Sequence, residues 1–271
     1  MRLNYVNIAC GDSYVEDWLN FDYVPHSPSV FKANLLGRLP LSDCTADILY
    51  SSHFFEHIPR MLVPAFLAEC FRVIKPAGRV RFVLPDLEEL CRSYLAEREQ
   101  GAHHKADFIV LEMLDQCVRL SPRGELGSYY AQVQSAPFQN KEMVDFIKQR
   151  TGTVIVSDIK PPGSKLREAI ANPAKVFYKL EQIYIRALVA MLPSAFRSQN
   201  VSMVPVGERH SWIYDFYTMK LLLEQTGFVN VKRTSATTSD IADFPFYPLD
   251  LAEDGRPRRG VESMYVEALR P

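Results

Sequence analysis

Residues 46–86 read ADILYSSHFFEHIPRMLVPAFLAECFRVIKPAGRVRFVLPD, and this stretch decides the fold. The short apolar run 47–52 predicts a buried strand that ends in polar residues. Apolar positions within 59–74 recur with the 3.6-residue period of an amphipathic helix, which Pro76-Ala77-Gly78 then ends. Residues 79–84 predict the next strand, and Pro85-Asp86 opens another helix. A strand, a helix and a strand joined by short turns predict two neighbouring parallel strands.

The same alternation continues on both sides of this stretch. Further strands are predicted at 5–9, 19–24, 30–36, 228–232 and 263–269, of which 30–36 is weak enough to be a loop. Residues from about 86 to 207 are rich in helical patterns, clearest at 106–120 and 174–192, and one more helix is predicted at 214–226. We therefore expect an α/β fold with helices on both faces of a parallel sheet and a helical insertion over its carboxyl edge.

The composition excludes several classes of protein. With 271 residues, 47% of them hydrophobic and 23% charged, the chain is globular and has room for one large domain or a core domain with an insertion. Lys and Arg total 31 against 32 Asp and Glu, which gives a net charge of -1. The one short basic run is Arg256, Arg258 and Arg259, so we expect no nucleic-acid partner.

Cysteine usage and hydropathy predict a cytoplasmic protein. The five cysteines are odd in number and none forms a Cys-x-x-Cys pair, so we expect reduced thiols. No spacing of potential ligands supplies the several converging groups that a metal site needs, so we predict no metal. The N-terminus lacks the apolar run of a signal peptide, and no window reaches the roughly 18 apolar residues of a membrane span.

The turn after the first predicted strand points to a ligand. Asn7-Ile8-Ala9-Cys10-Gly11 ends in small residues that let backbone amides approach a ligand. Asp22 ends the next strand, where a carboxylate can accept both hydroxyls of a ribose. Because no further glycine follows closely after Gly11, the G-x-G-x-x-G cradle of a pyrophosphate is missing. The pattern favours an adenosine without a phosphate clamp, and a tight turn with a solvated Asp22 explains it equally well.

Four groups of motifs carry a resemblance to a known family. They are NIACGD and DWLNFD at 7–12 and 17–22, LPLSD and ADILYSSHFFEHI at 39–43 and 46–58, RVIKPAGR at 72–79, and GERHSWIYD at 207–215. Together they resemble the class I S-adenosylmethionine (SAM) dependent methyltransferases, in particular small predicted members found with genes of surface-polysaccharide synthesis. The resemblance covers 5–92 and 207–269. Ala9 and Ala77 stand where that family usually has glycine.

The resemblance implies a Rossmann-like class I methyltransferase sheet, mostly parallel with its last strand antiparallel. It also implies a division into a SAM-binding half at 1–92, a helical insertion or lid at 93–206, and a C-terminal part of the α/β domain at 207–271.

A set of cofactor contacts follows from the same resemblance. In chain order these are Ala9, Cys10 and Gly11 against the methionine part of SAM, Asp22 at the ribose, Asn34 and Leu35 at the adenine, and Ser51, Ser52 and His53 beside the sulfonium. Asn34 could instead be only a turn residue. We do not expect Cys10 to be a nucleophile, because a free cysteine in such a turn usually acts as a small apolar residue.

Methyl transfer is an in-line displacement, so the protein mainly has to align nucleophile, methyl and sulfur. A hydroxyl nucleophile also benefits from a general base with a pKa near 7, commonly a histidine. The candidates are His53, His57 and His210, with Asp215 and Glu208 as orienting groups or alternative bases. Glu56 is predicted to begin a helix, where a carboxylate stabilises the helix dipole, so we expect it to be structural.

The expected function is SAM-dependent O-methylation of a sugar hydroxyl in a polysaccharide or glycan precursor, an acceptor that rests on the family association alone. Two alternatives stay open: transfer to nitrogen or carbon of a small metabolite, and a non-catalytic SAM-binding protein. The helix predicted at 174–192 combines a wide apolar face with Lys175, Lys179 and Arg186. Packing in the core, a homodimer interface and peripheral contact with a membrane all fit it.

Overall fold

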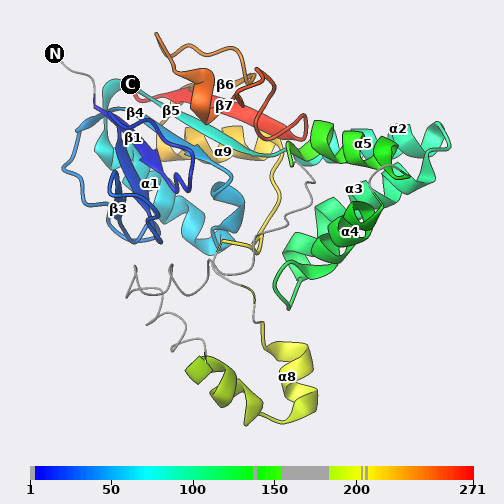
Figure 1. The fold of residues 1–271 in the computed structure, drawn as a ribbon. Helices are drawn as coiled ribbons and strands as arrows, with labels where there is room; N and C mark the ends of the chain where they lie inside the picture. Colours follow the sequence, from blue (N-terminus) through cyan, green and yellow to red (C-terminus); the bar gives the residue numbers. More distant parts are fainter. Residues whose placement is uncertain (1–3, 137–138, 154–182, 203, 205–206) are drawn as a thin grey trace.

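The computed structural model describes residues 4–136, 139–153, 183–202, 204 and 207–271, which are arranged around one seven-stranded sheet (Figure 1). The strands are β1 (Tyr5–Ile8), β2 (Leu19–Asp22), β3 (Val30–Lys32), β4 (Ala46–Ser52), β5 (Ile74–Pro85), β6 (Val229–Thr234) and β7 (Ser263–Leu269). Their order is β3-β2-β1-β4-β5-β7-β6. β1 to β5 are parallel, and β7 runs antiparallel to both of its neighbours. The predicted mixed sheet with an antiparallel last strand is confirmed.

β5 begins earlier than predicted. Helix α1 (Val63–Val73) passes directly into the strand, and Pro76-Ala77-Gly78 forms a bulge inside it rather than a turn before it. Ala77 has a φ of 62°, and a Cβ placed on Gly78 would lie 2.9 Å from the carbonyl oxygen of Asp47. The sequence pattern marked the interruption correctly, but the strand pairs with β4 on both sides of it.

The two faces of the sheet are covered differently. On one face α1 and α9 (Phe216–Thr226) pack over a large apolar core that includes Val6, Leu67, Phe82 and Leu223. On the other face a smaller aromatic core is closed by residues 236–251, which contain the short helix α10 (Phe246–Leu249). Two short 3-10 helices, η1 (Phe55–His57) and η2 (Arg60–Leu62), connect β4 to α1.

A group of four helices follows β5 and extends away from the sheet (Figure 1). They are α2 (Leu87–Glu99), α3 (His103–Val118), α4 (Gly124–Ser135) and α5 (Lys141–Thr151). α3, α4 and α5 share a small core of their own around Phe108, Leu126 and Ile147. α3, α4 and α5 fall within the predicted helical insertion at 93–206, α2 begins before it, and α3 corresponds to the helix predicted at 106–120.

The helix predicted at 174–192 lies partly outside the described residues, since the description resumes at 183. Residues 183–190 are helical and are followed by α8 (Ser194–Asn200). Among the described residues no helix is long and apolar enough to cross a bilayer.

A fully buried ion cluster joins the strands to the cover of the second face. Arg81 of β5 donates through Nε and Nη2 to Oδ2 of Asp250, at 2.9 and 2.7 Å, and through Nη1 to Oε1 of Glu267 at 2.6 Å. Its remaining hydrogen bonds go to the Thr234 hydroxyl and to the carbonyl oxygens of Ser235 and Thr238. Because Arg81 lies between two carboxylates with donors matched to acceptors, its charge stabilises the packing of β5 against β7 and the 236–251 segment.

Candidate active site

The carboxyl ends of β1, β2 and β4 lie side by side and bring the predicted cofactor residues to one edge. Ile8 pairs with Phe21 of β2 and with Ser51 of β4, so the residues that follow these strands are neighbours. Ala9 and Gly11 adopt left-handed φ angles of 54° and 51°, and no other atom lies within 4 Å of a Cβ placed on Gly11. The turn therefore leaves open space beside its backbone, as a bound ligand requires.

Asp22 is fixed at this edge by two backbone amides. Its Oδ2 accepts from the amide of Gly11 at 2.9 Å and its Oδ1 from the amide of Val24 at 2.9 Å. The side chain remains partly exposed, and each carboxylate oxygen has a second lone pair available. A preoriented carboxylate next to an open turn fits the ribose of SAM.

The other predicted cofactor residues take more local roles. The Ser51 hydroxyl is buried and donates to the carbonyl oxygen of Ile8 at 3.0 Å, and the Leu35 side chain is buried in the core under α1. Asn34 is exposed, and its Oδ1 accepts from the amide of Leu36 at 3.2 Å, which is the turn geometry considered above. Ser52, partly exposed, ends β4 directly before His53.

Cys10 is buried in the turn, and burial raises the pKa of its thiol to about 12. A thiol in this state is protonated at neutral pH and does not act as a nucleophile.

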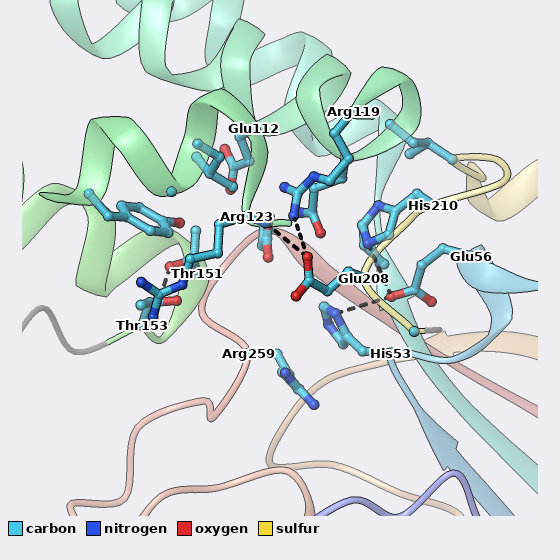
Figure 2. A pocket seen from close by; sticks show the side chains of 18 of the residues that line it. His53, Glu56, Glu112, Arg119, Arg123, Thr151, Thr153, Glu208, His210 and Arg259 are labelled. Carbon is cyan, nitrogen blue, oxygen red and sulfur yellow. Dashed lines mark hydrogen bonds and ion pairs between the residues drawn. The ribbon is translucent and has the colours of Figure 1, made fainter. Parts of the chain in front are cut away.

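A cavity of about 530 Å³ opens between the end of β4 and the α3–α4 pair (Figure 2). On the sheet side its wall is formed by His53, Glu56 and His57, and His210 approaches from the segment that precedes α9. On the opposite side it is lined by charged and polar residues of α3 to α5 and of the segment before β7, namely Glu112, Gln116, Arg119, Arg123, Tyr130, Gln134, Arg259 and Glu262. The structure thus brings three of the four predicted catalytic residues into one cavity.

Asp215 is the predicted residue that the structure keeps apart from this group. It is the N-cap of α9, and its Oδ1 accepts from the amide of Thr218 at 2.8 Å. Hydrogen bonds from the side chain and the amide of Thr218 lower the pKa of its carboxyl. It does not line the cavity. A carboxylate directly before a helix is typical of an N-cap, and the structure gives Asp215 that role.

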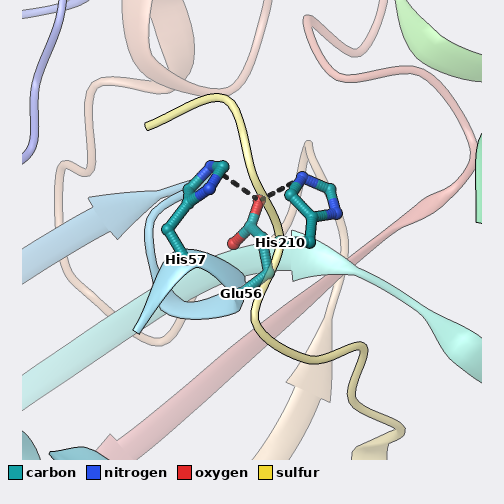
Figure 3. Close-up of side chains that lie close together, drawn as sticks. All are labelled: Glu56, His57 and His210. Carbon is teal, nitrogen blue, oxygen red and sulfur yellow. Dashed lines mark ion pairs between the residues drawn. The ribbon is translucent and has the colours of Figure 1, made fainter. Parts of the chain in front are cut away.

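Glu56 lies at the centre of the histidines. Its side chain is fully buried, and its Oε1 lies 3.3 Å from Nδ1 of His53 and 4.0 Å from Nε2 of both His57 and His210 (Figure 3). Burial alone would raise the pKa of the Glu56 carboxyl, but the adjacent histidines together outweigh this effect and lower the pKa to about 2. Burial lowers the pKa of His53 and that of His210, the latter to about 4. The carboxylate and the rings are therefore coupled: charge on the rings favours the ionised form of Glu56, whereas burial disfavours that charge on His53 and His210.

The segment 207–213 is tied to both walls. The amide of His210 donates to the carbonyl oxygen of Gln116 in α3, and the amide of Ser211 donates to the carbonyl oxygen of Glu56 at 2.7 Å. The Glu208 carboxylate accepts from the amide of Arg123 at 2.9 Å and lies 3.7 Å from Arg119. These contacts hold His210 over η1 although more than 150 residues separate it from Glu56 in the chain.

Two buried carboxyl groups form the far wall. Arg150 of α5 donates through Nε to Oε2 of Glu112 at 2.9 Å. Burial and the nearby Glu112 raise the pKa of Glu262 well above its ordinary value. Neither residue was a sequence candidate, since no local pattern signals that α3 and the segment before β7 meet.

Comparison with known proteins identifies a domain family in the N-terminal part of the chain. Residues 10–82 match the family described as "Methyltransferase domain". These residues form a methyltransferase domain. The match runs from the turn after β1 to Phe82 in β5 and so covers the predicted cofactor residues from Cys10 onward. The sheet has the Rossmann-like class I methyltransferase fold, and the cofactor is SAM.

Solved structures add a weaker likeness to this methyltransferase. A SAM-dependent methyltransferase from Archaeoglobus fulgidus aligns over 99% of this chain and 86% of its own, with 11% identity and a TM-score of 0.40. A possible histamine N-methyltransferase from Thermotoga maritima aligns over 100% and 83%, with 10% identity and a TM-score of 0.39.

A third structure is the complex of the Haloferax volcanii Trm112 activator with a putative methyltransferase, aligned over 100% of this chain and 85% of that chain, with 9% identity and a TM-score of 0.38. Identities and scores this low do not extend the substrates or partners of those proteins to this chain. A search of curated proteins found no match.

Proposed function

We propose that this methyltransferase acts on a hydroxyl of a sugar in a polysaccharide or glycan precursor. The polar lining of the cavity supports this acceptor. Arg123 and Arg259 face a space of about 530 Å³ beside the cofactor edge. An apolar acceptor would leave such groups without hydrogen bonds, at a cost of about 1–3 kcal/mol each, whereas sugar hydroxyls pair with them.

His53 is the proposed general base. Its Nε2 lies 2.8 Å from the Ser263 hydroxyl, whose own proton goes to the carbonyl oxygen of Arg259 at 3.2 Å. Its Nδ1 lies 3.3 Å from Oε1 of Glu56, so the buried carboxylate orients the ring. Bound SAM supplies a methyl group on a positively charged sulfur, and transfer forms a C–O bond as the C–S bond breaks. The hydroxyl proton then passes to the ring of His53, and Glu56 stabilises the charged ring.

Arg259 is the proposed contact for a phosphate of an activated precursor. It lines the cavity, and its Nε donates to no acceptor among the described residues. A guanidinium at a cavity wall favours a phosphate or a carboxylate of the acceptor.

The test is turnover with SAM against three groups of acceptors: nucleoside diphosphate sugars, free oligosaccharides and small amines. We expect release of S-adenosylhomocysteine with a sugar and methylation at oxygen, read by mass spectrometry. Methylation of amines alone would overturn the proposal in favour of the N-methyltransferase alternative. Binding of SAM without turnover on any acceptor would favour a non-catalytic protein.

A variant pair sharpens this test. Arg259→Ala should raise KM for a diphosphate-linked acceptor about ten-fold or more, as expected for loss of a charge-assisted hydrogen bond. Arg256→Ala is the matched control, because that arginine lies in the same segment, is exposed and pairs with Asp254. Equal KM values for the two variants would contradict the role of Arg259.

A further inference from the structure

The Glu56 carboxylate is buried without the partners that such a group normally has. Neither of its side-chain oxygens accepts an aligned hydrogen bond from any described residue, and the side chain is about 1% exposed. A buried carboxylate without donors is costly, so buried acids are usually paired, protonated or bound to a cation. Three imidazole rings surround Oε1 instead, and His57 and His210 flank it on opposite sides (Figure 3).

The hydrogen bonds of two of these rings leave one nitrogen of each facing the carboxylate. Nδ1 of His57 lies 2.9 Å from the carbonyl oxygen of Arg209, which can only accept, so Nδ1 carries a hydrogen and Nε2 is the nitrogen that faces Glu56. Nε2 of His53 lies 2.8 Å from the Ser263 hydroxyl, and its Nδ1 faces Glu56 at 3.3 Å. A metal ion displaces the proton from such a nitrogen when it binds, so these rings can serve as ligands beside Oε1 of Glu56.

The outward hydrogen bond of His57 is also the pattern found around metal ligands. A ligating histidine almost always donates its other ring N–H to a carbonyl or carboxylate, which fixes the tautomer and the ring orientation. Here the carbonyl oxygen of Arg209 accepts this hydrogen bond from His57.

We propose that Glu56, His57 and His210 bind a divalent first-row transition metal ion of the Zn²⁺ or Mn²⁺ class, with His53 beside it. One ligand atom from each of the three residues lies within 4.8 Å of the others. Bonds of about 2.0–2.2 Å to a shared ion need these atoms roughly 3–4 Å apart, which small rotations of the side chains achieve. Two imidazole nitrogens with one carboxylate oxygen favour such an ion over Mg²⁺ or Ca²⁺, which prefer all-oxygen sites.

Three protein ligands leave coordination positions open, and all three residues line the cavity. If the proposed function holds, an acceptor hydroxyl occupies one of these positions. The ion then lowers the pKa of that hydroxyl, and His53 takes its proton. The metal site itself does not depend on the nature of the acceptor, so binding and turnover can fail separately.

The experiment is direct metal binding by the full chain. After treatment with a chelator, the protein is titrated with Zn²⁺ by calorimetry and with Co²⁺ as a spectroscopic probe, with Mg²⁺ for comparison. We expect one Zn²⁺ per chain with micromolar or tighter affinity, a visible Co²⁺ band, and far weaker binding of Mg²⁺. Glu56→Gln and His210→Gln should each weaken Zn²⁺ at least 100-fold and abolish the Co²⁺ band.

His104→Gln is the matched control, because that histidine also lies near a carboxylate, Glu142 at 3.9 Å, but on the surface. It should bind Zn²⁺ like the wild type. Circular dichroism and SAM binding establish that each variant is folded. If Glu56→Gln does not fold, His57→Gln replaces it. No Zn²⁺ binding by the wild type, or equal binding by the folded site variants, would overturn the proposal. Zn²⁺ binding without turnover on sugars would leave the metal site standing and reject only the proposed acceptor.

Discussion

Arg81 and Glu56 are both buried charges at the carboxyl half of the same sheet, and their surroundings differ in one respect. Arg81 meets two carboxylates, a hydroxyl and two carbonyl oxygens, so its donors are matched with acceptors. Glu56 meets three histidines but accepts no aligned hydrogen bond among the described residues. A charge with complete partners serves the fold, whereas a buried charge with incomplete partners in a cavity is available to a ligand.

The largest effect should come from breaking the complete cluster. Arg81→Ala leaves Asp250 and Glu267 buried without their cation, which should lower the free energy of unfolding by about 3–5 kcal/mol. Urea denaturation measures it. Arg79→Ala is the control on the same strand, since that side chain is 25% exposed and pairs only loosely with Asp240, at 3.7 Å. A loss below about 1 kcal/mol for both variants would contradict the structural role of the Arg81 cluster.

Asp22 lies between Arg81 and Glu56 in this comparison, because backbone amides hold its carboxylate while part of it stays open to a ligand. Asp22→Ala should weaken SAM about ten-fold or more, as charge-assisted hydrogen bonds contribute about 1.5–3 kcal/mol. Calorimetry with SAM measures the affinity, and the exposed Asp254→Ala serves as the control. Wild-type affinity in a folded Asp22→Ala protein would remove Asp22 from the cofactor site.

Glu262 tests the far wall of the cavity. Its pKa is raised in the folded state, so protonated Glu262 contributes to the stability of the folded protein below the ordinary pKa of a glutamate. This contribution is lost as the pH rises through the raised value. Glu262→Gln resembles the protonated carboxyl and should unfold less readily than the wild type at pH 8, by about 1 kcal/mol or more, with little difference at pH 4. Thermal melting at both pH values checks this. The exposed Glu253→Gln should show no such pH dependence; if it does, the effect is not due to burial.

The smallest effect is expected at Cys10, a buried group without charge. With a thiol pKa of about 12, it should resist iodoacetamide at pH 8, whereas the exposed Cys44 and Cys91 react. Peptide mass spectrometry distinguishes the sites. Cys10→Ala should keep SAM affinity within about two-fold. Rapid alkylation of Cys10 in the native protein would show that the turn is more open than described.

The sequence allowed prediction of those features that residues close together in the chain determine. Strand periodicity, the turn at Ala9–Gly11 and the acid that ends β2 are local patterns, and the structure keeps Asp22 next to Gly11. The centre of the candidate site could not be read in this way. Glu56 looked like a residue at a helix start, because nothing near it in the chain signals that His210 returns to the same point. Asp215 shows the opposite case, since the role that the structure gives it is the local role of a helix cap.

The stretch between α5 and the 207–213 segment has a consequence for how this enzyme can evolve. Thr153 and Gly207 both line the cavity, and among the described residues the strands of the sheet lie before residue 86 or after residue 228. An insertion or deletion between 153 and 207 therefore alters the chain that leaves and re-enters the cavity rim without shifting the register of these strands. With the acceptor in this cavity, as proposed, a lineage can exchange acceptor preferences by replacing a single contiguous block of its gene, while the strands and the turn after β1 are inherited unchanged.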